Sequence, residues 1–288
     1  MVTSSFDYYA PTSVADALAL LDQHGDDAKL LAGGHSLIPL MKPRLAEPAV
    51  LIDLGKISTL SYINEQDGGL AIGAMTTYSE IAGSELVQSN APVLADASGQ
   101  VADNQIRNRG TIGGSLSHSD PAGDLPAVAL ALGAQLTTSS SGAHRTISAD
   151  DFFVDLLTTA LEPNEILSEI VIPALPAGTG TAYAKFANKA SHYAVVGVAA
   201  VVTVGSDGTC QSARIGITGA GPKATRATGT ESALVGSNLD DSAVRAAASH
   251  AGDGIDFNED VHASGEYRAH LTSVYAARAI RAAAENAS

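Results

Sequence analysis

The sequence predicts an α+β fold in two parts, separated by a proline- and glycine-rich stretch at residues 173–180. Before this stretch, short apolar runs that suit β-strands alternate with amphipathic helices. After it, β-rich runs come first and helices follow, and the stretch itself has the composition of a linker. We therefore expect one domain at residues 1–176, with subdomains of about 1–55 and 56–176, and a second domain at residues 177–288.

The first domain begins with a predicted amphipathic helix at residues 11–25, in which Ser13 suits the N-cap and Gly25 suits the end. Residues 105–118 are rich in turn-forming residues and predict a loop. A helix that starts with Asp124 as its cap, and with Pro126 in its first turn, is expected over residues 124–134. Further strands are predicted at residues 28–32, 50–54, 70–73 and 165–172, and further helices at 78–87 and 92–102.

The second domain is predicted to place its sheet before its helices. Two β-rich runs, at residues 194–204 and 211–218, are joined by Ser206-Asp207-Gly208, and Asp-Gly favours a tight hairpin turn. Helical patterns follow near residues 224–235, 240–251 and 264–284.

The charge and composition exclude several classes of function. The chain of 288 residues has 16 basic and 31 acidic side chains, and a net charge of −15 repels nucleic acid, which proteins bind largely through Lys and Arg. With 45 % apolar and 16 % charged residues, the chain is of the ordinary globular type. It has no apolar run near the ~18 residues of a membrane span and no secretion signal, so we expect a cytoplasmic protein, or one peripheral to the inner face of the membrane.

Potential metal ligands are few and scattered. Cys210 is the single cysteine, so the chain can form no internal disulfide and cannot supply the several thiolates of an iron–sulfur cluster. His118 and Asp120 form an H-x-D pair, but two ligands do not make a metal site, and the other histidines show no ligand spacing. We therefore expect no metal in this chain and place any metal redox centre on another chain.

Two glycine motifs are the strongest candidates for a binding site. The predicted strand at residues 28–32 runs into AGGHSLIPLMKPRL at residues 32–45, and GTIGGSLSHSDPAGDLPA follows at residues 110–127. A strand that opens into two glycines and a serine presents successive backbone N–H groups with no side chain in the way, which suits an anion. Two such loops suit a pyrophosphate. The alternative is that each glycine pair only turns the chain, and pattern alone leaves both readings open.

Two other motif readings are disfavoured. Residues 34–38 begin like the nucleophile elbow of a serine hydrolase, but Ile38 replaces the second glycine that this turn needs. Residues 219–222 begin like a dinucleotide-binding loop, but the third glycine is missing and Pro222 stops the helix that should follow.

The glycine motifs also carry a family resemblance. AGGHSLIPLMKPRL and QIRNRGTIGGSLSHSDPAGDLPA, together with residues 5–21, 166–173 and 264–271, resemble the FAD-binding medium subunit of the molybdenum hydroxylase (xanthine dehydrogenase) family, especially its carbon monoxide dehydrogenase type. The resemblance implies a vanillyl alcohol oxidase-like (PCMH-type) FAD-binding domain of two α/β subdomains. A C-terminal domain with a small antiparallel sheet and three helices is implied to follow.

The resemblance also implies which residues hold FAD. The pyrophosphate is implied to lie on the backbone of Ala32, Gly33, Gly34, His35 and Ser36 and of Thr111, Ile112, Gly113, Gly114 and Ser115. Asp124 is implied near the ribose–phosphate side, Leu167 along the flavin, Lys185 at its polar edge and Tyr193 beside the isoalloxazine. Without the resemblance, Tyr193 reads as ordinary sheet packing. Ser115 departs from the family, which often has Asn there, and no residue is expected to act catalytically on the organic substrate.

The function implied is that of an FAD-dependent oxidoreductase subunit that transfers electrons. In this family, a large subunit holds a molybdopterin cofactor and oxidises the substrate, and a small subunit with two [2Fe–2S] clusters passes electrons to FAD. An external acceptor such as a quinone then takes them up. The implied assembly is a dimer of heterotrimers, a heterohexamer, and the implied substrate is carbon monoxide. The alternatives are an N-heterocycle or aldehyde dehydrogenase, a stand-alone flavin oxidase and a cofactor-free scaffold.

Overall fold

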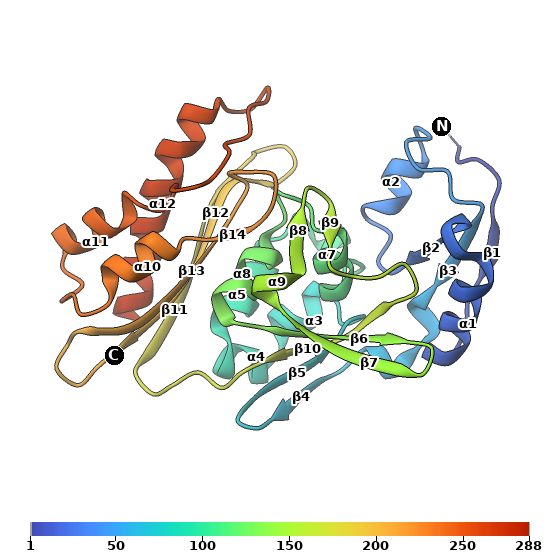
Figure 1. Ribbon diagram of the computed structural model, residues 1–288, viewed down its shortest axis with the longest axis horizontal. Helices are drawn as coiled ribbons and strands as arrows, with labels where there is room; N and C mark the ends of the chain where they lie inside the picture. The colour runs from blue at the N-terminus through green and yellow to red at the C-terminus, as the bar shows by residue number, and fades with distance from the viewer. Residues whose placement is uncertain (1, 288) are drawn as a thin grey trace.

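The computed structural model describes residues 2–287 and contains three successive α/β layers (Figure 1). The first is a parallel three-stranded sheet with the order β1-β3-β2, against which α1 packs. Its elements are β1 (Asp7–Tyr9), α1 (Val14–His24), β2 (Ala28–Leu31), α2 (Leu37–Met41) and β3 (Val50–Asp53). The Ser13 side chain accepts a hydrogen bond from the Asp16 N–H and Gly25 ends α1, which confirms the predicted caps.

The second layer is an antiparallel five-stranded sheet with the order β4-β5-β10-β6-β7. Its strands are β4 (Ile63–Gln66), β5 (Gly69–Gly73), β6 (Gln135–Ser140), β7 (Ala143–Ser148) and β10 (Ile166–Ile172). Its helices are α3 (Tyr78–Gly83), α4 (Glu85–Asn90), α5 (Pro92–Gly99), α6 (Asn104–Arg107), α7 (Ile112–His118), α8 (Asp124–Leu132) and α9 (Ala149–Phe152). A small hairpin of β8 (Phe153–Asp155) and β9 (Thr158–Thr159) lies beside α7 (Figure 1).

The third layer is an antiparallel four-stranded sheet with the order β11-β12-β13-β14, followed by three helices. Its elements are β11 (Thr179–Ala187), β12 (Ala194–Val204), β13 (Cys210–Thr218), β14 (Thr225–Arg226), α10 (Thr228–Leu234), α11 (Asp241–Ala248) and α12 (Gly265–Glu285). The sheet lies between α12 and α8 (Figure 1), and β12 is accordingly buried at every position from Ala194 to Val202. A strand covered on both faces reads as a continuous apolar run, as this one does.

Several sequence-based expectations were wrong in detail. The expected helix over residues 78–87 is two helices, because the Ser84 side chain accepts a hydrogen bond from the Val87 N–H and starts a new one. The expected loop at residues 105–118 contains α6 and α7. Gly123, rather than Asp124, is the N-cap of α8, because other side chains engage the Asp124 carboxylate.

Within residues 2–287 the hydrophobic core has three clusters, one for each layer. The largest joins the five-stranded sheet to α5, α7 and α8, and it includes Tyr183 and Ala199 of the third layer. The second and third layers therefore share a core. The domain boundary at 176/177 stays a prediction, as does the cytoplasmic location. Among residues 2–287 we find no helix with the length and hydropathy that crossing a bilayer requires.

Candidate functional site

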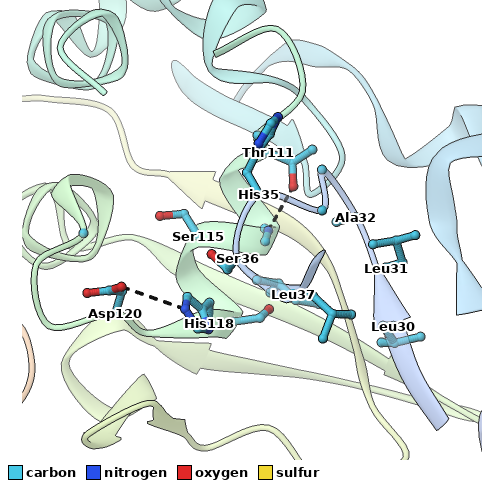
Figure 2. A pocket seen from close by; sticks show the side chains of 18 of the residues that line it. Leu30, Leu31, Ala32, His35, Ser36, Leu37, Thr111, Ser115, His118 and Asp120 are labelled. Atoms are coloured by element: carbon cyan, nitrogen blue, oxygen red, sulfur yellow. Dashed lines mark hydrogen bonds and ion pairs between the residues drawn. The ribbon is translucent and has the colours of Figure 1, made fainter. Parts of the chain in front are cut away.

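Both glycine motifs line a single pocket of about 610 Å³. Figure 2 shows residues of both motifs at this pocket, Ala32, His35 and Ser36 from the first and Thr111 and Ser115 from the second. The predicted residues that line the pocket are Ala32, Gly33, Gly34, His35, Ser36, Thr111, Gly113, Gly114, Ser115, Asp124, Leu167 and Tyr193. Ile112 and Lys185 are the two predicted residues that do not line it.

The first motif contributes backbone donors. After β2 the chain turns at Gly34, whose φ of +76° lies in the left-handed region that glycine adopts without strain. A Cβ on Gly33 would lie 2.1 Å from the Arg109 carbonyl oxygen, so only glycine allows this close approach of the two motifs. The backbone N–H groups of Gly33, Gly34, His35 and Ser36 have no hydrogen-bond partner within residues 2–287. Successive unpartnered N–H groups beside a pocket suit a phosphate.

The second motif has a different role from the first. The N–H groups of Ile112 and Gly113 donate to the carbonyls of Thr76 and Ala74, at 3.0 and 2.8 Å. The Gly114 N–H donates to the Thr111 hydroxyl at 3.1 Å (Figure 2). These donors are therefore used inside the protein, and the Ile112 side chain lies in the core. Among the lining residues of this motif, Thr111 and Ser115 bring hydroxyl groups to the pocket.

Asp124 carries a buried charge at the pocket wall. Its side chain is 5 % exposed, and one carboxylate oxygen lies 2.9 Å from the Lys185 ammonium nitrogen while the other accepts the Tyr183 hydroxyl. Burial raises the pKa of the Asp124 carboxyl, and Lys185 and Tyr183 act against this rise. Lys185, 2 % exposed, also donates to the Gln100 carbonyl at 3.2 Å. Lys185 therefore reaches the pocket only through Asp124, and its predicted place at a flavin edge stays a prediction.

Apolar and aromatic side chains complete the pocket. Leu167 on β10 is buried, whereas Tyr193, in the loop between β11 and β12, is 46 % exposed. Burial, together with the nearby carboxylates of Asp120 and Asp124, raises the pKa of Tyr193.

Further residues line the pocket that the sequence did not single out as ligands. Among them are Met75, Tyr78, Leu157, Leu161, Glu165, Ser191 and His192. The ring of Tyr78 packs against Gly110 of the second motif, where a Cβ would lie 2.5 Å from the ring, so this glycine is the one trace of Tyr78 in a motif. Burial raises the pKa of Tyr78 to about 12. The others come from loops without a motif.

His118 and Asp120 line the pocket together, with 3.9 Å between the imidazole Nε2 and a carboxylate oxygen (Figure 2). No third ligand joins them, and residues 2–287 contain no group of three His, Cys, Asp or Glu side chains arranged to hold a metal ion. The pocket thus offers a phosphate-binding turn, hydroxyl groups, one buried carboxylate and an apolar wall. This set suits an elongated phosphorylated ligand with a flat ring.

Two family models match the chain. Residues 4–175 match the FAD binding domain in molybdopterin dehydrogenase, and residues 181–283 match the CO dehydrogenase flavoprotein C-terminal domain.

Relatives match over the full length. The chain is 42 % identical to the carbon monoxide dehydrogenase medium chain of Hydrogenophaga pseudoflava, with 98 % of each chain covered. It is 39 % identical to the alpha subunit of the 6-hydroxypseudooxynicotine dehydrogenase complex of Paenarthrobacter nicotinovorans, with 100 % of this chain and 97 % of that one covered.

Solved structures agree with these matches. A carbon monoxide dehydrogenase from Hydrogenophaga pseudoflava superposes with a TM-score of 0.96 at 43 % identity, covering 99 % of both chains. Quinoline 2-oxidoreductase from Pseudomonas putida 86 superposes with a TM-score of 0.93 at 35 % identity, covering 100 % of this chain and 99 % of that one. The predicted fold class is confirmed, and the chain belongs to the family of FAD-binding medium subunits of molybdenum hydroxylases.

Proposed function

We propose that this chain holds one FAD in the pocket between its glycine motifs and is the electron-transfer subunit of a molybdenum hydroxylase. The observation that carries the proposal is the run of unpartnered N–H groups from Gly33 to Ser36, beside a pocket of about 610 Å³, in a chain of an FAD-binding family. A pyrophosphate supplies the anionic oxygens that such a run of donors needs.

The remaining pocket residues would orient the cofactor. The hydroxyls of Thr111 and Ser115 donate on the phosphate side, and the Asp124 carboxylate accepts from hydroxyl groups of the cofactor. Leu167 and Tyr193 exclude water from the ring and fix its plane. Bound FAD supplies the chemistry, because its ring takes up and releases electrons. The protein binds, orients and shields.

This chain is a subunit of a heteromeric enzyme, as are relatives that match it along its whole length. We propose that a large subunit with a molybdopterin cofactor and a small subunit with two [2Fe–2S] clusters complete the enzyme, as a dimer of heterotrimers, and that a quinone accepts the electrons. The single buried cysteine supports this division, because one thiolate does not hold a cluster.

Carbon monoxide is the substrate that we propose for the complex. Two carbon monoxide dehydrogenase medium chains are 42 % and 40 % identical to this chain over 98 % of its length. An N-heterocycle is the second candidate, because the 6-hydroxypseudooxynicotine dehydrogenase subunit is 39 % identical over the full length. Assays of the purified complex with carbon monoxide, an N-heterocycle and an aldehyde, each with a dye acceptor, separate these candidates.

The FAD proposal is tested on the full chain purified with the subunits that accompany it. We expect one FAD per copy of this chain by flavin absorption and by release on denaturation. We also expect bleaching of the flavin when the complex receives its substrate. A chain that copurifies with no flavin and takes up no added FAD contradicts the proposal. Turnover of an alcohol by this chain alone favours the stand-alone oxidase instead.

A further inference from the structure

Tyr183 and Lys185 reach the same carboxylate from one strand. They are two residues apart on β11, so their side chains leave the same face of the sheet. The Tyr183 hydroxyl donates to one oxygen of Asp124, and the Lys185 ammonium nitrogen lies 2.9 Å from the other. All three side chains are buried. Asp124 belongs to the first domain, so this contact joins the two domains at the pocket wall.

The neighbouring strand leaves room for the Tyr183 hydroxyl. Gly197 on β12 pairs with Lys185 in the sheet register, and a Cβ on Gly197 would lie 2.4 Å from the Tyr183 hydroxyl oxygen. Any other residue at position 197 would push this hydroxyl out of its place. The glycine therefore belongs to the arrangement that holds Asp124.

The main chain before Asp124 is held by the same sheet. The Pro121 carbonyl accepts from the Gly219 N–H at 2.7 Å, and the Gly123 carbonyl accepts from the Thr218 hydroxyl at 2.7 Å. The Ala122 carbonyl accepts from the Ala194 N–H at 3.3 Å. The Cα position of Asp124 is thus fixed by β12 and β13, and what stays free is the rotation of its side chain.

We propose that Tyr183 is a positioning residue of the FAD site, which fixes the rotamer of Asp124 so that the remaining lone pairs of the carboxylate face the pocket. This inference rests on the proposed contact of Asp124 with FAD. Lys185 alone cannot set the rotamer, since an ammonium on a flexible chain acts as a point charge, and this one also binds the Gln100 carbonyl. A phenol on a rigid ring has its oxygen at a fixed place and donates only near the plane of the ring.

The electrostatics support this role. Burial, then the charge of Asp124, raises the pKa of Tyr183 well above its ordinary value, so the hydroxyl keeps its proton and donates throughout the working pH range. Because the Asp124 carboxylate only accepts hydrogen bonds, it needs donors on the protein side to remain ionised when buried.

The test is a double-mutant cycle in the full chain, with FAD as the probe. Tyr183→Phe keeps the ring and removes the hydroxyl, and we expect the FAD dissociation constant to rise on the order of tenfold, the usual size of a lost hydrogen bond to a charged group. In an Asp124→Asn background the same change should have much less effect, because the group that Tyr183 positions has changed. Tyr275→Phe is the matched control, since its hydroxyl has no hydrogen-bond partner in the described chain.

The outcomes separate the inference from the proposed function. If Asp124→Asn leaves FAD affinity unchanged, Asp124 does not contact FAD, and the inference fails with that assignment. If Asp124→Asn weakens FAD and Tyr183→Phe does not, only the inference fails. It also fails if Tyr183→Phe weakens FAD equally in both backgrounds, since the hydroxyl would then act through the fold. A thermal melt of each variant identifies those that are merely unfolded.

Discussion

At the scale of single residues, Gly34 and Gly25 allow the effect of a substitution on backbone conformation to be separated from its effect on the binding site. Both have a positive φ, +76° and +51°, but only Gly34 lines the pocket. A Cβ is strained at a positive φ at both positions, and on Gly34 it would also lie 2.8 Å from the Ile38 Cδ1. We expect Gly34→Ala and Gly25→Ala both to lower the melting temperature, whereas only Gly34→Ala should also lower FAD content. Equal FAD content in the two variants would remove the first motif from the site.

Glu165, which lines the pocket, makes the stability of the protein depend on pH. Its carboxylate accepts from the Arg145 Nε at 2.6 Å and from the Glu162 N–H at 2.9 Å, and these bonds, led by that from Arg145, hold its pKa below the ordinary 4.5. The stabilisation is therefore complete above about pH 4.5 and is lost as the pH falls through the lower pKa of the folded state. We expect Glu165→Gln to flatten the fall in melting temperature below pH 4.5. An unchanged slope would show that Glu165 does not contribute.

The pocket residues that lie in motifs could be predicted from the sequence, whereas the role of Tyr183 could not. The motifs are local, since each is a strand or helix end whose glycines can be read from a few neighbouring letters. Tyr183 acts on a residue 59 positions away, and in the sequence it lies in a segment for which no element was predicted. Which of several tyrosines meets a buried carboxylate depends on the register of β11 against β12, and only the structure gives that register.

At the scale of elements, α7 depends on its glycines for packing. A Cβ on Gly113 would lie 2.6 Å from the Ala74 carbonyl oxygen, so this helix lies closer to its neighbour than alanine permits. We expect Gly113→Ala to lower the free energy of unfolding by about 1–3 kcal/mol through overpacking. A Cβ on Gly99, at the end of α5, would meet only the Ala82 Cβ, at an ordinary contact distance of 3.9 Å, so Gly99→Ala should instead stabilise by roughly 0.5–1 kcal/mol. Denaturant titrations measure both effects. Unfolding midpoints that shift in the same direction for Gly113→Ala and Gly99→Ala would contradict this account.

The elements missed from the sequence share one physical reason. The α7 sequence, IGGSLSH, is poor in helix formers, and β11 begins inside a stretch with the composition of a linker. Both are formed by tertiary contacts: α7 by its fit against Ala74, and β11 by pairing along β12. Elements with a clear period and caps, such as α1, were predicted correctly because local sequence suffices for them.

At the scale of the whole molecule, a cluster of charges joins the second layer to the third. Asp150 on α9 accepts from Arg214 on β13 at 3.1 Å and from Arg226 on β14 at 3.2 Å. Burial would raise the pKa of Asp150, but the two arginines outweigh it and lower the pKa below 3.8, so this stabilisation is lost only as the pH falls through that lower value.

We expect Asp150→Ala to cost about 1 kcal/mol at neutral pH, after allowance for solvent screening. Asp241→Ala removes two exposed ion pairs, with Arg245 and Arg281, and should lower the stability by less. Thermal melts at neutral pH and near pH 3 compare the two variants. The difference in melting temperature between Asp150→Ala and the parent chain should be smaller near pH 3. A constant gap would show that the charge of Asp150 is not responsible.

The turn before α8, with carbonyls bonded to Ala194, Thr218 and Gly219, also sets an order of events during synthesis. Chains leave the ribosome from the N-terminus and domains fold as units. The glycine motifs emerge early, but Asp124 takes its place only after β12 and β13 have followed. A nascent chain that has made both motifs therefore still lacks the contacts that fix Asp124, and we expect a finished pocket only after residue 219 has left the ribosome.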